Sequence, residues 1–147
     1  INNEISSFDF INYLQKKDVT LSLPVIDTKN NSMNFKKWIL FDKLINGPFG
    51  TMEPPKTQIS ILPQILIVPM LSFDKELYRL GYGGGYYDKS ITILKKHFKK
   101  ERKFFITIGL AYSIQEEKKI PKEKHDMKLD YIITEKKVLS NFNHKKY

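Results

Sequence analysis

The chain has 147 residues, of which 41% are hydrophobic and 13% aromatic, and its formal net charge is +9. This composition is typical of a globular domain, and the absence of cysteine excludes a disulfide framework, a thiolate zinc site and a cysteine nucleophile. No apolar run approaches the length of a membrane span and nothing resembles a signal peptide, so we expect a cytoplasmic protein with no membrane partner.

The first half of the chain predicts a helix, a strand and a long loop. A short helix is expected to end near Lys17 and to bury Phe10, Ile11 and Leu14. Val19–Val25 alternates like a strand that ends near Pro24. A turn is expected at 30–32, the aromatic stretch 35–41 with Trp38 is ambiguous between a strand and an irregular segment, and the Gly- and Pro-rich residues 46–63 predict a surface loop that holds Glu53.

The second half predicts a βαβ unit. Residues 65–69 read as a buried strand, residues 86–99 as a helix and residues 104–110 as a second strand. Such a crossover is expected to be right-handed with parallel strands. Ligands in sheets of this kind lie at the carboxyl ends of the strands. A further strand is expected over 129–134, followed by a lysine-rich tail, from Lys136, that is partly frayed.

The stretch from Arg79 to Asp88 contains four of the chain's seven glycines and separates the first of these strands from the helix. A strand, a glycine-rich turn and a helix in this order favour an anion site, because glycines let the backbone approach a phosphate and the first turn of the helix has free N–H groups. Arg79 would add a positive fork and Asp88 could hold a magnesium ion. Glycine triplets also occur in hairpin turns and flexible loops, so the triplet alone does not establish a phosphate site.

The pair His125-Asp126 precedes the last predicted strand. Its spacing favours a turn with an Asx-type hydrogen bond. A second carboxylate that shares magnesium with Asp88 is the other interpretation, and the sequence alone leaves both open. Only one of the chain's three histidines belongs to this segment, which argues against zinc.

Several separated motifs resemble those of the 5-formyltetrahydrofolate cyclo-ligase family, also called methenyltetrahydrofolate synthetases. The resemblance extends over nearly the whole chain. It implies an α/β fold with a mainly parallel sheet flanked by helices, in a Rossmann-like three-layer domain. The residues that carry it are Glu4-Ile5, Gly50, Glu53-Pro54, Ile67-Val68-Pro69, Phe73-Asp74, Arg79-Leu80-Gly81, Gly83, Gly85-Tyr86-Tyr87-Asp88, Gly109-Leu110-Ala111, Gln115, Pro121, His125-Asp126, Leu129-Asp130 and Ile133-Thr134.

The resemblance also implies an activity, which is the ATP-dependent conversion of 5-formyltetrahydrofolate to 5,10-methenyltetrahydrofolate with release of ADP and phosphate. It implies catalytic roles for Arg79 and Asp88, and Mg²⁺ held by Asp88 and Asp126. The residues it assigns to ATP are Arg79, Leu80, Gly81, Tyr82, Gly83, Gly84, Gly85, Tyr86 and Tyr87. Those it assigns to the folate, with or without a polyglutamate tail, are Glu4, Tyr82, Gly83, Gly84, Gly85 and Tyr86.

The sequence departs from the family pattern in three places. We expect a single monomeric domain over residues 1–147 that lacks the family's N-terminal helical segment, whose Lys and Arg contact the ATP phosphates. Met70 stands where the family usually has Gly, and Leu77 where it usually has a turn Gly, so a position that needs a positive φ would be strained. The alternative is therefore a truncated relative that binds nucleotide with little or no activity.

A basic nucleic-acid-binding module is the alternative from another class, because the charge of +9 would suit it. The lysines are spread along the chain, however, and clusters such as Lys95-Lys96 suit the end of a helix without a polyanion. We therefore expect no nucleic-acid partner. A nucleotide or a polyglutamylated substrate would use the same charge.

Overall fold

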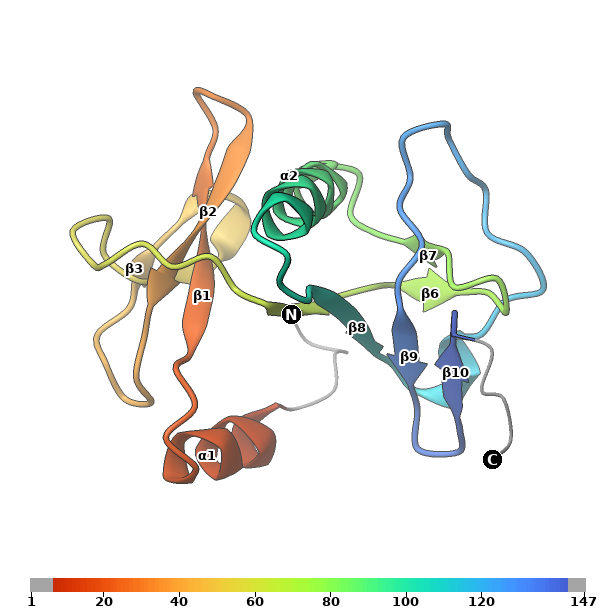
Figure 1. The fold of residues 1–147 in the computed structure, drawn as a ribbon, viewed down its shortest axis with the longest axis horizontal. Helices are drawn as coiled ribbons and strands as arrows, with labels where there is room; N and C mark the ends of the chain where they lie inside the picture. Colours follow the sequence, from red (N-terminus) through yellow and green to blue (C-terminus); the bar gives the residue numbers. More distant parts are fainter. Residues whose placement is uncertain (1–6, 143–147) are drawn as a thin grey trace. The chain divides into compact units, whose positions relative to one another are not determined.

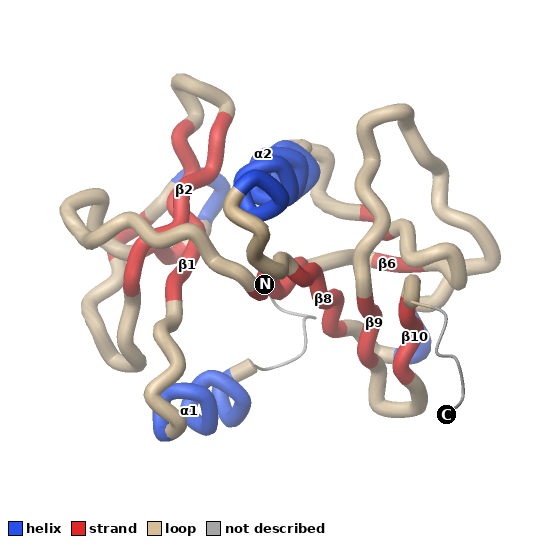
Figure 2. Tube along the Cα trace, viewed as in Figure 1, coloured by secondary structure: helices blue, strands red, loops and turns tan. Residues whose placement is uncertain are grey.

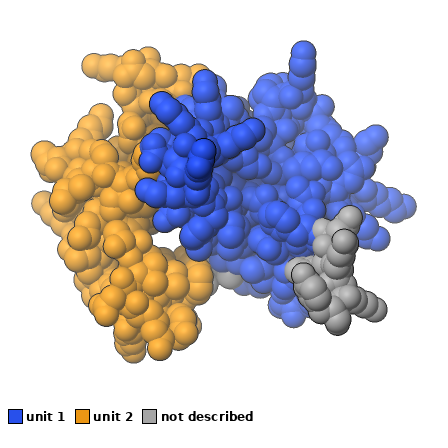
Figure 3. Space-filling view, viewed as in Figure 1, with its two compact units in different colours: residues 1–5, 64–147 blue, residues 6–63 orange. Residues whose placement is uncertain are grey.

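The computed structural model describes residues 7–142, which contacts within the chain divide into two compact units, 7–63 and 64–142 (Figure 3). The expectation of a single domain stays a prediction. Across residues 7–142, no helix combines the length and the apolar character needed to cross a membrane.

The unit 7–63 is built on an antiparallel hairpin of β1 and β2 (Figure 1). Met33 and Phe35, two residues apart in β2, are both buried, because alternate residues of a strand point to the same face. Trp38 is buried and belongs to the core. The elements of this unit are α1 (Phe8–Lys16), β1 (Ser22–Asp27), β2 (Ser32–Lys37), β3 (Ile45–Asn46), the 3₁₀-helix η1 (Pro48–Gly50) and β4 (Met52–Glu53).

The helix α1 lies where the sequence predicts it, but the prediction that it buries Phe10, Ile11 and Leu14 is wrong. The side chain of Phe10 is 45% exposed, and Ile11 and Leu14 are only half-buried. The helix meets a loop rather than a sheet: the backbone N–H of Leu40 donates to Gln15 Oε1 at 2.8 Å. A loop covers less of an apolar stripe than a sheet does.

Two further boundaries in this unit differ from the prediction. The strand β1 begins at Ser22 and continues through Pro24 to Asp27. Proline is tolerated there because β1 pairs with one strand, β2, in the described structure, which leaves an edge that needs no N–H donor. The predicted loop 46–63 is not irregular throughout, because it contains the last residue of β3, the 3₁₀-helix η1 and all of β4 (Figure 2).

The unit 64–142 contains a four-stranded sheet with the order β10-β9-β8-β5. The pairs β5–β8 and β8–β9 are parallel, whereas β9–β10 is antiparallel. The predicted α/β class with a mainly parallel sheet is confirmed. The elements of this unit are β5 (Ile65–Val68), β6 (Ser72–Phe73), β7 (Arg79–Leu80), α2 (Tyr86–Lys100), β8 (Ile106–Leu110), the 3₁₀-helix η2 (Ser113–Gln115), β9 (Tyr131–Ile133) and β10 (Val138–Ser140).

The helix α2 forms because apolar residues recur at helical spacing. Ile91, Leu94 and Phe98 are buried, and the ring of Phe98 stacks on that of Phe105 with centroids 5.8 Å apart. The resemblance implies several helices beside the sheet. Within residues 64–142 the structure contains one α-helix, α2 (Figure 1). The predicted βαβ unit is confirmed as β5, α2 and β8.

Two elements of this unit were not predicted. An antiparallel pair of short strands, β6 and β7, lies between β5 and the glycine stretch. Part of the tail expected to be partly frayed forms β10 over Val138–Ser140, because β9 offers it a pairing edge, and residues 143–147 of this tail lie outside the described residues.

A buried polar contact joins β8 to the residue just before β9. The backbone N–H and the Oγ1 of Thr107 donate to Asp130 Oδ2 at 2.9 and 2.8 Å, and the Asp130 N–H donates to Thr107 Oγ1 at 2.9 Å. These reciprocal bonds satisfy groups that would be costly to bury unpaired, and they help to set the register of the two strands.

Candidate active site

The glycine stretch connects β7 to α2. Since α2 returns the chain to the start of the parallel strand β8, the first turn of the helix lies toward the carboxyl end of β5, where ligands of parallel sheets are bound. The structure therefore places the stretch from Arg79 to Asp88 at the expected edge of the sheet.

The backbone of this stretch needs glycine at two positions. Gly83 has φ of 85° and Gly85, the N-cap of α2, has φ of 64°, both in the left-handed region. A Cβ built at Gly81, Gly83 or Gly85 would meet no atom within 4 Å. The α-carbons of these three glycines therefore face open space, which lets a phosphate approach the backbone there.

The tyrosines of the stretch differ in exposure. The side chain of Tyr82 is 52% exposed, whereas Tyr86 and Tyr87 are half-buried. A Cβ built on Gly84 would lie 2.7 Å from Cδ2 of Tyr86, so the ring of Tyr86 rests against the backbone of Gly84. Of the three, Tyr82 has the most surface for stacking on a flat ligand.

Arg79 and Asp88 form a bidentate ion pair across the glycine loop. Arg79 Nη2 donates to Asp88 Oδ2 at 2.9 Å and Nη1 donates to Oδ1 at 3.1 Å. Their side chains are only 5% and 15% exposed. The fork of the guanidinium matches the carboxylate, and partial burial reduces the screening by water.

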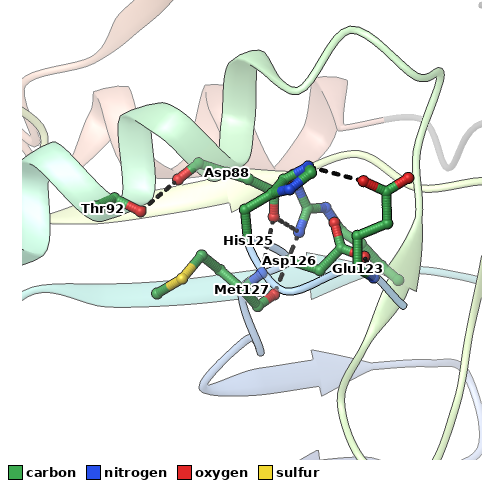
Figure 4. A network of polar contacts seen from close by, with 7 residues as sticks. Asp88, Thr92, Glu123, His125, Asp126 and Met127 are labelled. Atoms are coloured by element: carbon green, nitrogen blue, oxygen red, sulfur yellow. Dashed lines mark hydrogen bonds and ion pairs between the residues drawn. The ribbon is translucent and has the colours of Figure 1, made fainter.

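The loop that holds Asp126 is bound to the same carboxylate. The Met127 N–H donates to Asp88 Oδ1 at 3.0 Å, and the Met127 carbonyl accepts from Arg79 Nη1 at 3.5 Å. The predicted turn forms, since the Asp126 N–H donates to the Glu123 carbonyl at 3.1 Å, but the predicted Asx-type bond is wrong: Asp126 Oδ2 accepts the N–H of Glu123 upstream, at 2.7 Å, and not an N–H further along the chain (Figure 4). The exposed His125 lies 3.5 Å from a carboxylate oxygen of Glu123.

The donor set fits magnesium better than a metal held by protein alone. Within residues 7–142, no group of three or more His, Asp or Glu side chains is placed to hold a metal ion. Mg²⁺ commonly takes one or two carboxylates together with substrate phosphates. Asp88 accepts three of the about four hydrogen bonds a carboxylate can accept, and Asp126 accepts one, so both keep acceptor capacity for a cation.

Positive charge gathers beside this site around Tyr78. The Nζ atoms of Lys122 and Lys128 lie 4.2 and 5.0 Å from the centroid of the Tyr78 ring. Lys122 also bonds to the Glu76 carboxylate, which lowers the pKa of Glu76 and raises the pKa of Lys122. Because Glu76 offsets the charge of Lys122, the region attracts anions less than its two lysines alone would.

The sequence assigned no role to Asp74, which proves to organise the β6–β7 turn. Its side chain is 1% exposed. Oδ1 accepts the N–H groups of Glu76 and Tyr78 at 2.9 and 3.2 Å, and Oδ2 accepts the Ile120 N–H at 3.0 Å. Its place in the motif Phe73-Asp74, next to a turn, was the available signal.

The two internal departures from the family pattern have structural counterparts. Leu77 has φ of 70°, so the expected positive φ, and with it the strain for a leucine, is confirmed. The side chain of Met70 is buried against Gly109, where a Cβ would overlap its Cε. Because Gly109 has no side chain, there is room for the side chain of Met70, which stands where the family usually has glycine.

Two acidic candidates lie apart from this site in the chain. Glu4 lies outside the described residues, so its role stays a prediction. Glu53 is buried in the unit 7–63, where Oε1 accepts the Ile26 N–H and the Thr51 hydroxyl, each at 3.1 Å. These bonds tie β4 to β1 and give Glu53 a structural role.

Comparisons with known proteins agree with this α/β arrangement. The model of the 5-formyltetrahydrofolate cyclo-ligase family matches residues 1–135. The chain is 32% identical over 134 residues to the 5-formyltetrahydrofolate cyclo-ligase of Haemophilus influenzae, covering 87% of this chain and 68% of that protein. It is 27% identical over 142 residues to that of Escherichia coli, covering 93% of this chain and 75% of that protein.

A solved structure gives the same result. The 5,10-methenyltetrahydrofolate synthetase of Aquifex aeolicus matches with a TM-score of 0.71 at 27% identity, over 100% of this chain and 74% of that chain. These matches define an α/β ligase. The chain belongs to the 5-formyltetrahydrofolate cyclo-ligase family.

Proposed function

We propose that this protein converts 5-formyltetrahydrofolate to 5,10-methenyltetrahydrofolate and consumes ATP in doing so. The observation that carries the proposal is the glycine loop, whose α-carbons at Gly81, Gly83 and Gly85 face open space at the start of α2, one turn from Asp88. The family assignment supplies the folate. The same assignment makes a cytoplasmic monomer our working expectation.

The chemistry needs a phosphate donor because the formyl group at N5 is an amide, with a carbon of low electrophilicity and an oxygen that leaves poorly. Transfer of the γ-phosphoryl group to this oxygen breaks the bond to ADP and activates the carbon. N10 of the same folate then attacks and releases its proton to solvent, the ring closes, and the C–O bond breaks as phosphate departs. Such a transfer depends on positioning and charge neutralisation, so it requires no nucleophile from the protein.

The chain's own groups would share this work. Backbone N–H groups of Gly81 to Gly85 and the first turn of α2 would bind the triphosphate, as helix N-termini bind anions. Asp88 and Asp126 would hold Mg²⁺, which neutralises phosphate charge when it is bound. Tyr82 and Tyr86 would contact the folate, together with Glu4, whose carboxylate suits the N–H donors of the pterin ring.

The test is the rise in absorbance of the methenyl product, with purified protein, 5-formyltetrahydrofolate, magnesium and ATP. We expect turnover that requires both ATP and magnesium. Magnesium-dependent ATP binding without turnover would instead identify a relative that keeps only the nucleotide site. Preference for single-stranded or duplex oligonucleotides over ATP in a competition titration would overturn the proposal in favour of a nucleic-acid-binding module.

A further inference from the structure

We propose that Arg79 is a positioning residue that acts through Asp88, and that it does not bind the triphosphate itself. The proposal rests on the proposed function, since it assigns Arg79 a task in building the magnesium site. It replaces the phosphate-binding role that the sequence suggested for this arginine.

The first support is how the guanidinium is used. Both Nη atoms donate to Asp88, and Nη1 also faces the Met127 carbonyl. The Nε atom is buried and has no partner within the described structure, while the whole side chain is only 5% exposed. An arginine that binds a triphosphate needs exposed N–H donors. In Arg79, both Nη atoms already donate to the Asp88 carboxylate.

The second support is what the pair connects. Arg79 belongs to β7, Asp88 to the first turn of α2, and Met127 directly follows Asp126 in the chain. The Met127 N–H donates to the same Oδ1 that accepts from Arg79 Nη1. The arginine therefore fixes the orientation of one proposed magnesium ligand and secures the loop that carries the other.

The third support is the remaining acceptor capacity. Asp88 Oδ1 accepts two hydrogen bonds in this network, whereas Oδ2 accepts one, from Arg79 Nη2. Oδ2 therefore keeps acceptor capacity for a cation while the pair stays intact. Groups that orient metal ligands from outside the coordination shell typically change metal affinity or activity about 10- to 100-fold when they are removed.

The experiment separates an effect on magnesium from an effect on phosphate. ATP affinity is measured by calorimetry with EDTA and with magnesium, and the magnesium concentration for half-maximal turnover is measured in parallel. The variants are Arg79→Lys, which keeps the charge but loses the fork, and the double variant Arg79→Met with Asp88→Asn, which keeps the net charge of the pair. Arg102→Lys is the matched control, because Arg102 is exposed on the loop after α2.

We expect the double variant to bind ATP in EDTA within about twofold of the wild-type affinity, since no phosphate contact is removed. Arg79→Lys should raise the magnesium requirement about tenfold and leave the affinity in EDTA unchanged. Arg102→Lys should change neither quantity. Thermal melting confirms that each variant is folded, and a neutral pair of similar volume is tolerated where a lone buried charge is not.

If the wild-type protein binds ATP and converts the folate, either of two results would overturn this inference and leave the proposed function intact. One is a loss of about tenfold or more of ATP affinity in EDTA for the double variant, which would identify Arg79 as a phosphate ligand. The other is an unchanged magnesium requirement in Arg79→Lys. If wild-type protein bound no ATP under either condition, the proposed function would fall and this inference with it.

Discussion

The terminal Cε of Met70 fills the space that a Cβ on Gly109 would need. The two residues lie on different parts of the unit 64–142, Gly109 within β8 and Met70 two residues beyond β5, and both are buried. A methionine where the family usually has glycine is thus accommodated by a glycine on the neighbouring strand.

This contact predicts a cost for Gly109→Ala and its rescue. The added methyl group would overlap Met70 Cε and come within 2.9 Å of Leu129 Cδ1. Overpacking of this kind destabilises a protein by about 1–3 kcal/mol. Urea unfolding of Gly109→Ala, of Met70→Ala and of the double variant measures the coupling. Strictly additive effects would show that the two residues do not compete for this space.

The backbone of Leu77 predicts that a glycine substitution there is less destabilising than an alanine substitution. Its side chain is 3% exposed while its φ is 70°. Leu77→Ala loses the buried side chain and keeps the backbone strain, for which about 2–5 kcal/mol is expected. Leu77→Gly loses the same side chain but removes about 1–2 kcal/mol of left-handed strain. The glycine variant should therefore be the more stable one by denaturant unfolding, and the reverse order would contradict the strain.

In the glycine loop, we expect one alanine substitution to weaken nucleotide binding and another to lower the stability of the fold. Gly81→Ala places a methyl group in open space without a positive φ, so the free protein should keep its melting temperature. Gly83→Ala, at φ of 85°, should cost about 1–2 kcal/mol of stability. If the backbone of Gly81 contacts the triphosphate, ATP affinity measured by calorimetry should fall in Gly81→Ala. Unchanged affinity would remove Gly81 from the ATP site.

Asp88→Ala should disturb the fold more than the sequence suggests. From the sequence alone, loss of magnesium-dependent ATP binding with an intact fold is expected. In the structure the substitution leaves Arg79 buried and unpaired, which typically costs about 3–5 kcal/mol. Asp88→Asn, which keeps the shape and one acceptor, is expected to cost less. Equal melting temperatures of wild-type protein and Asp88→Ala would contradict the importance of the pair.

Glu135 predicts a pH dependence on the acid side. The Ser113 hydroxyl and the Ser113 N–H donate to its carboxylate, in this order of effect, and lower the pKa of Glu135 below its ordinary value of 4.5. Because the folded-state pKa is the lower one, the stabilisation is present above pH 4.5 and is lost as the pH falls through the folded-state value. Urea unfolding at neutral and acidic pH should show a smaller change for Glu135→Gln than for wild-type protein.

The matched control for this prediction is Glu101→Gln, the same substitution at an exposed residue at the end of α2. It removes a carboxylate without removing the contact to Ser113. A pH dependence equal to that of Glu135→Gln would show that the effect is one of net charge and not of this hydrogen bond.

Much of the fold of residues 64–142, and the position of the glycine loop, could be predicted from local patterns in the sequence. The spacing of Ile91, Leu94 and Phe98 determined α2, the apolar strands determined the parallel pairing of β5 with β8, and the glycines determined a loop at the helix start. Each depends on a periodicity of the backbone or on a conformation that one residue type adopts most easily, and such properties can be read along the chain.

Only the tertiary structure decided which side chains meet. Nothing in the spacing of Arg79 and Asp88 predicts a bidentate pair, because their contact depends on the path of the loop between them, which includes positive φ angles at Gly83 and Gly85. The exposure of Phe10 could not be read either, since an apolar residue is buried only where another element covers it. Contacts between distant segments depend on how the elements pack, and that information is not local to either segment.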